Sequence, residues 1–457
     1  MKGTNEVTKP RRSARHRALM ASLAGAVALV AGACGSTAHS SAPAANSSGS
    51  TGSSASGGAT TAGTIAPPAA VTGTLSGPGV TATTITLGQI TTTSGPVPGL
   101  FEGANQGLAA WAAYMNAHGG IDGRTIKIVS ADDGFNCNTY TSDLKNFAKQ
   151  VFAMVGTFTL EDTCGKSVLA ANPNLIDVQG AALDPTLYSV PNVFTPAPDP
   201  PGYQTTPYAY IKSLFPNDIT HTASLVGSPA AANGKEEQLT AESIGYKYVY
   251  TRLIGPFETN FTSDILRMKN DGVKIVDLGA VAVNDVADFI QQAAQQNFRP
   301  DAIISAPAYD AQLLELIGNA SLADNILYAP LPYPLYLGTD RASVPAVNTF
   351  LTWLDKTYPG KSANIYSVSA WAAGTLLVDG MRAAGPNIDQ ASVIKALDGI
   401  HTFNAGGLVA PSDPGGRQGT HCVVVAGVRN GQWVRIHPSS GFDCSGVYHN
   451  VPLSALK

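Results

Sequence analysis

The sequence predicts an α/β protein with two similar lobes, and three observations support this fold class. Short apolar stretches of strand character alternate with segments of helical periodicity, which is typical of βαβ units around a parallel sheet. The alternation starts at Thr81, is interrupted by prolines between Pro196 and Pro201, and then starts again. Hydrophobic residues make up 44% of the 457 residues, which is enough for a substantial core and excludes a wholly disordered chain.

The first residues have the layout of an export signal. A basic stretch at 9–17 is followed by an uncharged apolar run at 18–30 and by small residues up to Ala33. This order is that of a secretory signal peptide, here residues 1–33, and the apolar run is too short and too rich in Ala and Gly for a membrane-spanning helix. We therefore expect an extracytoplasmic protein. The Arg11-Arg12 pair keeps twin-arginine export open beside the general secretory route, which we favour.

Cys34 directly follows the small residues and resembles the cysteine of a bacterial lipobox, which is lipidated and becomes the mature N-terminus. After it, the composition up to residue 80 is dominated by Ser, Gly, Ala and Thr, and no charged residue occurs between Arg17 and Glu102. Such a segment buries too little apolar surface to offset its ordering entropy. We expect residues 34–80 to be a lipidated cysteine and a disordered tether that anchors the protein to the cell membrane. A plain secreted protein with a free thiol is the alternative.

The elements of the first block follow in order along the chain. Two glycines, Gly119-Gly120, end the first helix, and Gly156 ends the third strand. The strands are expected at 84–90, 126–129, 152–155 and 175–178, and the helices around 108–115 and 144–151.

The second block repeats this rhythm, and a third stretch departs from it. Strands are expected at 223–226, 249–251, 273–276 and 302–304, with helices around 265–268 and 286–293. Two further helices are expected around 344–354 and 371–381. They are followed by strands at 422–425 and 433–436, which a turn containing Asn430-Gly431 joins.

Four cysteines remain when Cys34 is set aside: Cys137, Cys164, Cys422 and Cys444. An even number in an exported protein indicates disulfides. Pairing neighbours gives Cys137–Cys164 and Cys422–Cys444, the two shortest closures among three possible connectivities, and the other connectivities stay open. The spacings match no metal motif, and four reduced core cysteines are the alternative.

Charge and motifs exclude several function classes. Lys and Arg number 28 against 32 Asp and Glu, a net charge of −4, so the chain lacks the basic surplus that nucleic-acid binding requires. Two Gly-Lys-Ser sequences lack the first glycine of a phosphate-binding loop, because Leu160 and Asp355 stand in its place. Two Ser-x-x-Lys sequences, which start at Ser142 and Ser392, lack the other elements of penicillin-recognising enzymes. We therefore expect no enzyme, no metal and no cofactor.

The chain resembles the extracellular solute-binding proteins of the leucine/isoleucine/valine type, which deliver ligands to ABC importers. The resemblance extends over about residues 82–436, and Cys137 and Cys164 lie near the place where many members have a disulfide. The segments that match the family are Leu87-Gly88 together with residues 94–97, Met115–Arg124 followed by Asp132-Asp133, and residues 371–374 together with residues 381–385.

This resemblance implies a type I periplasmic binding fold: two doubly wound parallel-sheet lobes joined by three crossovers, with a ligand cleft between them. Lobe I would comprise residues 81–198 plus 336–405, and lobe II residues 199–335 plus 406–457. The implied activity is the capture of a small organic ligand by lobe closure and its presentation to the transmembrane subunits of an ABC permease, by a monomer.

Ligands of open parallel sheets bind at the carboxyl ends of strands, and the candidate ligand contacts follow from this rule. On the first lobe they are Ser94, Thr157, Phe158, Thr159, Ala181 and Ala182, with Tyr366 at the rim. Ala282, Tyr309 and Asp310 would face them from the second lobe. Each polar residue among them can instead be a cap or turn former, and for Asp310 an N-cap is an equal interpretation.

Departures from the family pattern bear on the ligand. In amino-acid-binding members an acid of the second lobe meets the ligand ammonium, and here that position falls on Ala308. Because a buried ammonium without a counter-charge is costly, we expect a ligand other than a simple branched-chain amino acid, less polar, such as an aromatic or carboxylic compound. Asp310 could substitute for the acid only if its loop is shifted. The alternatives are a ligand-sensing receptor that reports to a signalling partner, and a branched-chain amino acid binding protein.

Overall fold

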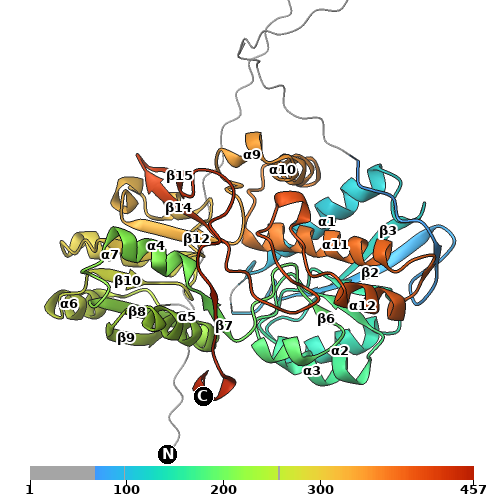
Figure 1. Cartoon of the computed structure of the whole chain (residues 1–457), viewed down its shortest axis with the longest axis horizontal. Coiled ribbons are helices and arrows are strands. Elements are labelled where there is room, and N and C mark those ends of the chain that lie inside the picture. Colours follow the sequence, from blue (N-terminus) through green and yellow to red (C-terminus); the bar gives the residue numbers. More distant parts are fainter. Residues whose placement is uncertain (1–66, 97, 256–257, 457) are drawn as a thin grey trace, which may run out of the picture. The chain divides into compact units, whose positions relative to one another are not determined.

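The computed structural model describes residues 67–96, 98–255 and 258–456, and two large β-sheets organise this part of the chain (Figure 1). The predicted signal peptide, the lipidation site Cys34 and most of the predicted tether lie outside the described residues. In the described part, no helix combines the length and the apolar character needed to cross a membrane.

The first sheet has five strands in the order β3-β2-β4-β5-β6, and all neighbours are parallel. Its second strand, β2, buries Ile85 and Leu87 completely. The strands are β2 (Thr84–Thr91), β3 (Thr125–Asp132), β4 (Ala153–Val155), β5 (Ile176–Val178) and β6 (Val193–Phe194). The helices packed with them are α1 (Glu102–Ala117), α2 (Cys137–Phe147) and α3 (Asp162–Ala171), together with α10 (Pro345–Thr357), α11 (Ile365–Ala383) and α12 (Gln390–Asp398) from late in the chain.

The second sheet has seven strands in the order β15-β14-β12-β11-β10-β8-β9. Its parallel strands are β8 (Thr222–Gly227), β9 (Tyr248–Ile254), β10 (Ile275–Asp277), β11 (Ala302–Ile304) and β12 (Leu327–Leu331). The antiparallel hairpin of β14 (Val424–Arg429) and β15 (Gln432–His437) completes it, as the Asn430-Gly431 turn predicted. Its helices are α4 (Thr206–Leu214), α5 (Ala231–Ser243), α6 (Thr262–Asn270), α7 (Val283–Gln295) and the short α8 (Leu313–Leu316).

The chain passes between the two sheets three times: after β6, after β12 and before β14. Two side-chain hydrogen bonds connect these passages to their surroundings. Ser412 Oγ donates to the carbonyl oxygen of Pro196 at 2.6 Å, and the hydroxyls of Tyr333 and Ser369 share a hydrogen bond of 2.6 Å. The predicted fold class, doubly wound parallel sheets joined by three crossovers, is confirmed.

The glycine-rich segment after α1 has a local structural explanation. Asn116 pairs with the backbone of Ile126 at the start of β3, since its Oδ1 accepts from the N–H at 2.8 Å and its Nδ2 donates to the carbonyl at 3.0 Å. Gly120 has a φ of +70°, and a Cβ there would lie 2.0 Å from the carbonyl oxygen of Arg124. Only glycine fits this turn, which therefore fixes how α1 leads into β3.

The folded part begins earlier than the sequence predicted. β1 (Thr74–Leu75) pairs in parallel with β13 (Asn387–Ile388), and Val71 and Leu75 are buried. The tether was expected to reach residue 80 because small polar residues dominate this stretch. Two apolar side chains and one backbone pairing are enough to attach its end to the late helices.

The last passage between the sheets lies later than the expected boundary at residue 406. The short η4 (Ala405–Gly407) packs against α10 and α11. Arg417 forms an ion pair with Asp398 of α12 at 3.1 Å and lies over the ring of Phe194. Residues 405–417 therefore stay with the first sheet, and the lobe boundaries themselves remain a prediction.

Candidate functional site

Polar side chains without partners mark the carboxyl ends of strands in both sheets. Thr157 follows β4 and Ser305 follows β11, both are buried, and neither Oγ atom has a hydrogen-bond partner. The Oε1 atom of Gln179, directly after β5, is also buried without a hydrogen-bond partner. A buried polar atom without a partner costs about 1–3 kcal/mol, so these atoms are positions where a ligand or water would supply a missing hydrogen bond.

The loop after β4 is held by a second set of hydroxyls. Thr159 Oγ1 donates to the Asp133 carboxylate, and Thr92 Oγ1 donates to Thr159 Oγ1 at 3.3 Å. Gly180 donates its N–H to the Thr157 carbonyl at 3.0 Å, which ties the ends of β4 and β5 together. Thr159 is thus occupied inside the protein, and its contribution is to orient the loop that carries Thr157 and Phe158.

Three aromatic rings form a cluster at the same strand ends. The ring centroids of Phe101 and Phe158 are 5.5 Å apart, those of Phe101 and Tyr366 5.0 Å, and those of Phe158 and Tyr366 5.3 Å. The rings come from the residue before α1, from the loop after β4 and from the first turn of α11. Such tilted and edge-on contacts are favourable and hold each ring in a defined orientation.

A second aromatic group comes from the other sheet. Tyr309 lies 4.9 Å from Tyr336 and 4.9 Å from Trp433, measured between ring centroids. Its hydroxyl accepts the N–H of Leu337 at 2.8 Å, and the Tyr336 hydroxyl donates to its carbonyl at 3.3 Å. The loop after β11 is therefore fastened to the second passage between the sheets.

Asp310 connects the two aromatic groups electrostatically. Burial and, after it, the negative charge of Asp310 raise the pKa of Tyr366 to about 12. Burial also raises the pKa of Asp310 itself, although its Oδ1 accepts the N–H of Gln312 at 2.8 Å. Asp310 thus forms a turn before α8, whereas the N-cap of α8 is Gln312, so the N-cap interpretation of Asp310 was wrong. Its carboxyl group is half-buried and influences the pKa of Tyr366.

The remaining candidates are Ser94, Ala181, Ala182 and Ala282, and of these Ala181 packs against the buried cluster that contains Phe158. Ser94 is exposed, and its N–H donates to Asp132 Oδ1 at 3.2 Å. Although partial desolvation opposes it, hydrogen bonds from Ser94, Thr93 and Gly134 lower the pKa of Asp132 to about 2. Ala282 is exposed directly before α7, Ala182 is buried among the helices of the first sheet, and Ala181 is half-buried beside it.

Sequence reasoning missed Phe101, Tyr336 and Trp433. Phe101 lies between a proline-rich loop and a helix, where an aromatic residue carries no periodic signal. Trp433 donates its Nε1–H to the Asp310 carbonyl oxygen at a distance of 3.3 Å. Trp433 lies in β15, more than a hundred residues later in the chain than Asp310. Such a contact follows from the pairing of β14 with β15 and has no local signature.

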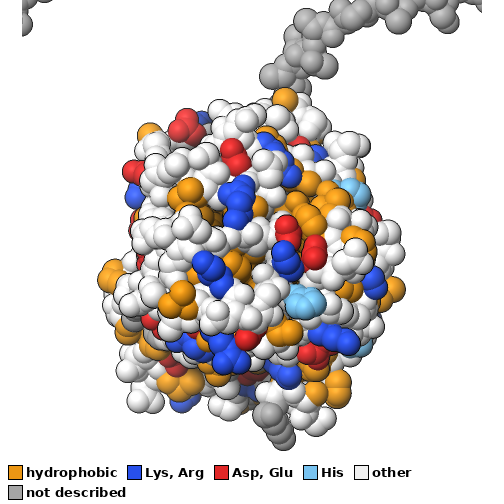
Figure 2. All heavy atoms as spheres, turned by 90° about the vertical axis from the view of Figure 1, so that its left-hand side faces the viewer, with side chains coloured by type: hydrophobic (Ala, Val, Ile, Leu, Met, Phe, Trp, Pro, Cys, Tyr) orange, Lys and Arg blue, Asp and Glu red, His pale blue; other side chains and the backbone are white. Residues whose placement is uncertain are grey.

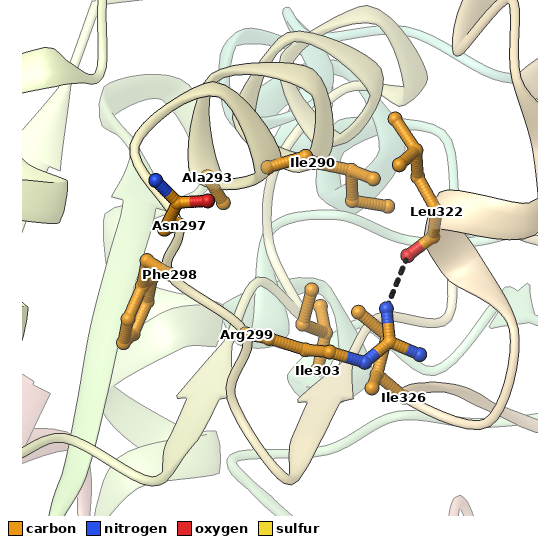
Figure 3. Close-up of a pocket in the computed structure, with 9 residues that line it drawn as sticks. Ile290, Ala293, Asn297, Phe298, Arg299, Ile303, Leu322 and Ile326 are labelled. Carbon is orange, nitrogen blue, oxygen red and sulfur yellow. Dashed lines mark hydrogen bonds between the residues drawn. The ribbon is translucent and has the colours of Figure 1, made fainter.

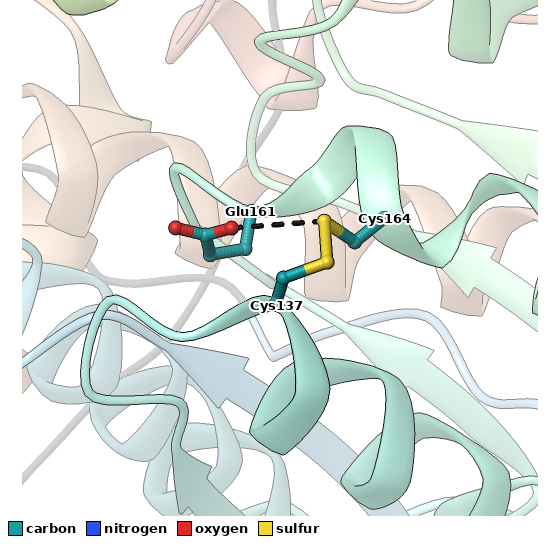
Figure 4. A group of neighbouring side chains, drawn as sticks. All are labelled: Cys137, Glu161 and Cys164. Atoms are coloured by element: carbon teal, nitrogen blue, oxygen red, sulfur yellow. Dashed lines mark hydrogen bonds between the residues drawn. A yellow bond between two sulfur atoms is a disulfide. The ribbon is translucent and has the colours of Figure 1, made fainter.

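Both predicted disulfides are present. Cys137 pairs with Cys164 and Cys422 with Cys444, with Cα–Cα distances of 5.7 Å and 4.1 Å. Glu161 lies beside the first of them, with a carboxylate oxygen 3.6 Å from Cys164 Sγ (Figure 4). These three residues are the group closest to metal-ligand geometry in the described part of the chain, but the sulfurs are bonded to each other and offer no thiolate.

Surface charge on the side of the second sheet is mixed. Basic and acidic side chains are interspersed over the face shown in Figure 2 rather than gathered by sign. This distribution agrees with the near balance of 28 basic and 32 acidic residues in the sequence. It gives that face no electrostatic basis for holding a polyanion.

Comparison with known proteins identifies one family. The model of the periplasmic binding protein family matches residues 84–432. No curated protein sequence is significantly similar to this chain.

Solved structures share the fold at low sequence identity. A fatty acid ABC transporter substrate-binding protein from Thermomonospora curvata is 17% identical, with a TM-score of 0.68 over 82% of this chain and 95% of that chain. A branched-chain amino acid transporter substrate-binding protein from Streptococcus pneumoniae, in complex with isoleucine, is 18% identical and has a TM-score of 0.62. The match covers 77% of this chain and 100% of that chain. A solute-binding protein from R. palustris, in complex with 4-hydroxybenzoate, is 18% identical and has a TM-score of 0.63. The match covers 77% of this chain and 95% of that chain.

Proposed function

This chain belongs to the periplasmic binding protein family, and on that premise we propose that it is the solute-binding component of an ABC importer. It captures a small organic solute between its two lobes and presents it to the transmembrane subunits of the permease. The observation that carries the proposal is that strands of both sheets are followed, at their carboxyl ends, by a buried hydroxyl without a partner: Thr157 after β4 and Ser305 after β11. A ligand bound at this place touches both lobes, and its binding free energy therefore favours lobe closure.

The proposal includes export and anchoring. The segment before Cys34 has the order of a signal peptide, and Cys34 has the position of a lipidated cysteine. A lipid at Cys34 and the following Ser/Gly/Ala/Thr-rich segment would keep the binding protein near the permease. Both disulfides agree with an oxidising compartment outside the cytoplasm.

The ligand we propose is an aromatic or apolar carboxylic compound rather than a simple branched-chain amino acid. Phe101, Phe158 and Tyr366 offer aromatic surface, and Thr157 and Ser305 offer hydroxyls that lack partners. Position 308, where the family acid for an ammonium would stand, is a buried alanine. Two solved structures that share the fold support this ligand class: one is named a fatty acid ABC transporter substrate-binding protein, and another is in complex with 4-hydroxybenzoate.

Branched-chain amino acid binding is the second candidate, and Asp310 favours it. Its carboxyl group is half-buried beside Tyr366 and Tyr336 and could meet an ammonium. In that case Asp310→Asn would abolish leucine binding, because the buried ammonium would lose its counter-charge. If the ligand carries no ammonium, Asp310→Asn leaves its affinity within about threefold of the wild-type value.

A thermal-shift screen followed by calorimetry tests the function. The mature protein is titrated with leucine, isoleucine, benzoate, 4-hydroxybenzoate and octanoate, since a compound that binds the folded state raises the midpoint of unfolding. We expect stabilisation by an aromatic or apolar carboxylate, and loss of about tenfold or more in its affinity in Tyr366→Ala. Tyr358→Ala, which removes a tyrosine from the end of α10, is the matched control. Stabilisation by leucine alone would refute the proposed ligand class but not the family function, whereas equal affinities in both variants would refute the site.

A further inference from the structure

A second concave site lies at the opposite edge of the second sheet from Tyr309 and Asp310. It is a pocket of about 320 Å³ between the C-terminal end of α7 and the segment that leads into β12 (Figure 3). Ile290 and Ala293 of α7 line one side, and Leu322 and Ile326 line the opposite side. The pocket lies at the amino ends of β11 and β12, whereas the candidate site described above lies at their carboxyl ends, so the two sites are distinct.

The pocket combines a mostly apolar lining, which includes Phe298, with one amide, Asn297, and one cation, Arg299. Ile290, Ile303 and Ile326 are at most 7% exposed, and Ala293 is 3% exposed, so the interior is apolar. Arg299 lies at the base of the pocket opposite α7, as Figure 3 shows, and its residue is exposed to solvent. Such a lining favours an apolar ligand, because the binding free energy becomes more favourable with the apolar surface area that is removed from water.

The Arg299 guanidinium is held in place without a carboxylate. Nη1 donates to the Leu322 carbonyl at 3.4 Å and Nη2 to the Asp324 carbonyl at 2.5 Å, and among the described residues no acidic side chain pairs with it. The nearest acid in sequence, Asp301, lies with its Oδ2 3.9 Å from Lys274 Nζ. Asp324, whose carbonyl accepts from Arg299, accepts the N–H of Gly431 with its Oδ1 at 2.9 Å. A guanidinium presents five donors in a fixed fork, so an uncompensated one at the edge of an apolar pocket suits a carboxylate.

We propose that this pocket binds a small aliphatic carboxylate, with its tail among Ile290, Ala293 and Ile303 and its carboxylate at Arg299. A volume of about 320 Å³ is at the lower end of the range for ligand pockets, roughly 300–1,000 Å³, which limits the occupant to a short chain. The proposal goes beyond the proposed function, because this site is separate from the solute site and would be occupied whatever solute that site takes.

Calorimetric titration of the mature protein with hexanoate, octanoate, decanoate and 1-octanol tests this proposal. We expect affinity to rise roughly fourfold for each added methylene until the pocket is full. Arg299→Gln should weaken octanoate binding about tenfold or more while leaving 1-octanol binding within a factor of two, because only the carboxylate uses the guanidinium. Arg267→Gln, which removes another exposed arginine near the same sheet, is the matched control and should change neither affinity.

Two further variants separate this pocket from the solute site. Because octanoate is also a test compound for the solute site, Ala293→Phe and Arg299→Gln are made in the Tyr366→Ala background, where octanoate binding at the pocket should remain. There Ala293→Phe fills the pocket and should abolish octanoate binding, and Arg299→Gln should weaken it. If Tyr366→Ala removes all octanoate binding, or if neither added substitution weakens what remains, the assignment is overturned and the proposed function is untouched. If Ala293→Phe fails to fold, the exposed Arg299→Gln decides alone. Absence of octanoate binding by the wild-type protein also overturns the assignment.

Discussion

The Tyr448 hydroxyl lies 2.8 Å from Asp199 Oδ1 and, at the same time, 2.6 Å from the carbonyl oxygen of Pro200. The hydroxyl donates to this carboxylate and to the carbonyl oxygens around it, which include that of Gly202 at 3.1 Å. Burial raises the pKa of Asp199 to about 6, although the hydrogen bond from Tyr448 opposes this rise. The contact attaches β16 (Tyr448–Asn450) to the first passage between the sheets, which precedes β7 (Gly202–Gln204).

Stability should therefore fall as the pH rises. Burial and the nearby Asp199 charge raise the pKa of Glu236 to about 8, and burial raises the pKa of Glu237 well above its ordinary value. Because these folded-state pKa values exceed the unfolded values of about 4, the contribution is complete below about pH 4 and is lost as the pH rises through about 6 to 8. We expect urea unfolding at about pH 8 to give a free energy at least about 1 kcal/mol lower than at about pH 5.

Asp199→Asn is the control for this pH dependence. The amide oxygen still accepts from Tyr448 and the side chain does not titrate, so the unfolding free energy of the variant should depend less steeply on pH between about pH 5 and 7. A pH dependence identical to that of the wild-type protein would show that Asp199 does not contribute to it, which would contradict the raised pKa of Asp199.

Removal of one partner of the Arg435–Asp340 ion pair should be strongly destabilising. The two side chains are 11% and 6% exposed, and Asp340 Oδ2 also accepts the N–H of Leu335 at 2.7 Å. Arg435→Met leaves a buried carboxylate without its counter-charge, and we expect a loss of about 3–5 kcal/mol in the free energy of unfolding. The exposed pair Arg267–Asp271 is the control, since Arg267→Met should cost less than about 1 kcal/mol. Equal costs would show that the buried pair is solvated.

Loss of the second disulfide should loosen the C-terminal segment. The Cys422–Cys444 bond closes a loop with a sequence separation of 22, between the residues before β14 and those before β16. The double variant Cys422→Ala/Cys444→Ala should lose about 2–4 kcal/mol, and hydrogen exchange should accelerate in β16. The matched comparison is Cys137→Ala/Cys164→Ala, which should lose a similar free energy without a change in the exchange of β16. Unchanged exchange in both variants would contradict the assigned role.

Gly180 controls the position of Phe158 in the candidate site. A Cβ at Gly180 would lie 2.1 Å from the Phe158 ring, so Gly180→Ala must displace that ring. We expect the variant to weaken binding of the solute found in the screen about tenfold, while the free energy of unfolding falls by about 1–3 kcal/mol from overpacking. Gly255→Ala, where a Cβ meets no atom within 4 Å, is the control. Calorimetry that finds unchanged affinity in Gly180→Ala would exclude Phe158 from the ligand contacts.

Much of the fold was predictable because its signals are local. The strand around Ile85 and Leu87 alternates, Gly119-Gly120 ends its helix, and Asn430-Gly431 makes the turn of a hairpin. The disulfide pairing was one of three possibilities from sequence and was settled by which cysteines lie within bonding distance. The end of the tether was misjudged because Val71 and Leu75 gain their burial from β13, more than three hundred residues later in the chain.

The candidate site was only partly predictable, for the same physical reason. The rule that ligands bind at the carboxyl ends of strands led to Thr157, Phe158, Tyr309 and Asp310 as candidates, because strand ends are visible in a sequence, and their contact with a ligand remains a prediction. It could not assign partners to them. Phe101 and Trp433 reach these loops through helix packing and antiparallel pairing, which depend on contacts between distant segments.

By itself, the amino-acid sequence determined the alternation of strands and helices, the apolar content of the core and the pattern of an exported chain, since these depend on neighbouring residues. The tertiary structure alone decided that Thr157 and Ser305 keep buried oxygens without partners, that Asp310 lies near Tyr366, and that Asp199 shares the Tyr448 hydroxyl with Pro200. Burial and charge at a side chain are set by whatever packs around it, and those neighbours come together only when the two sheets and the three passages between them are in place.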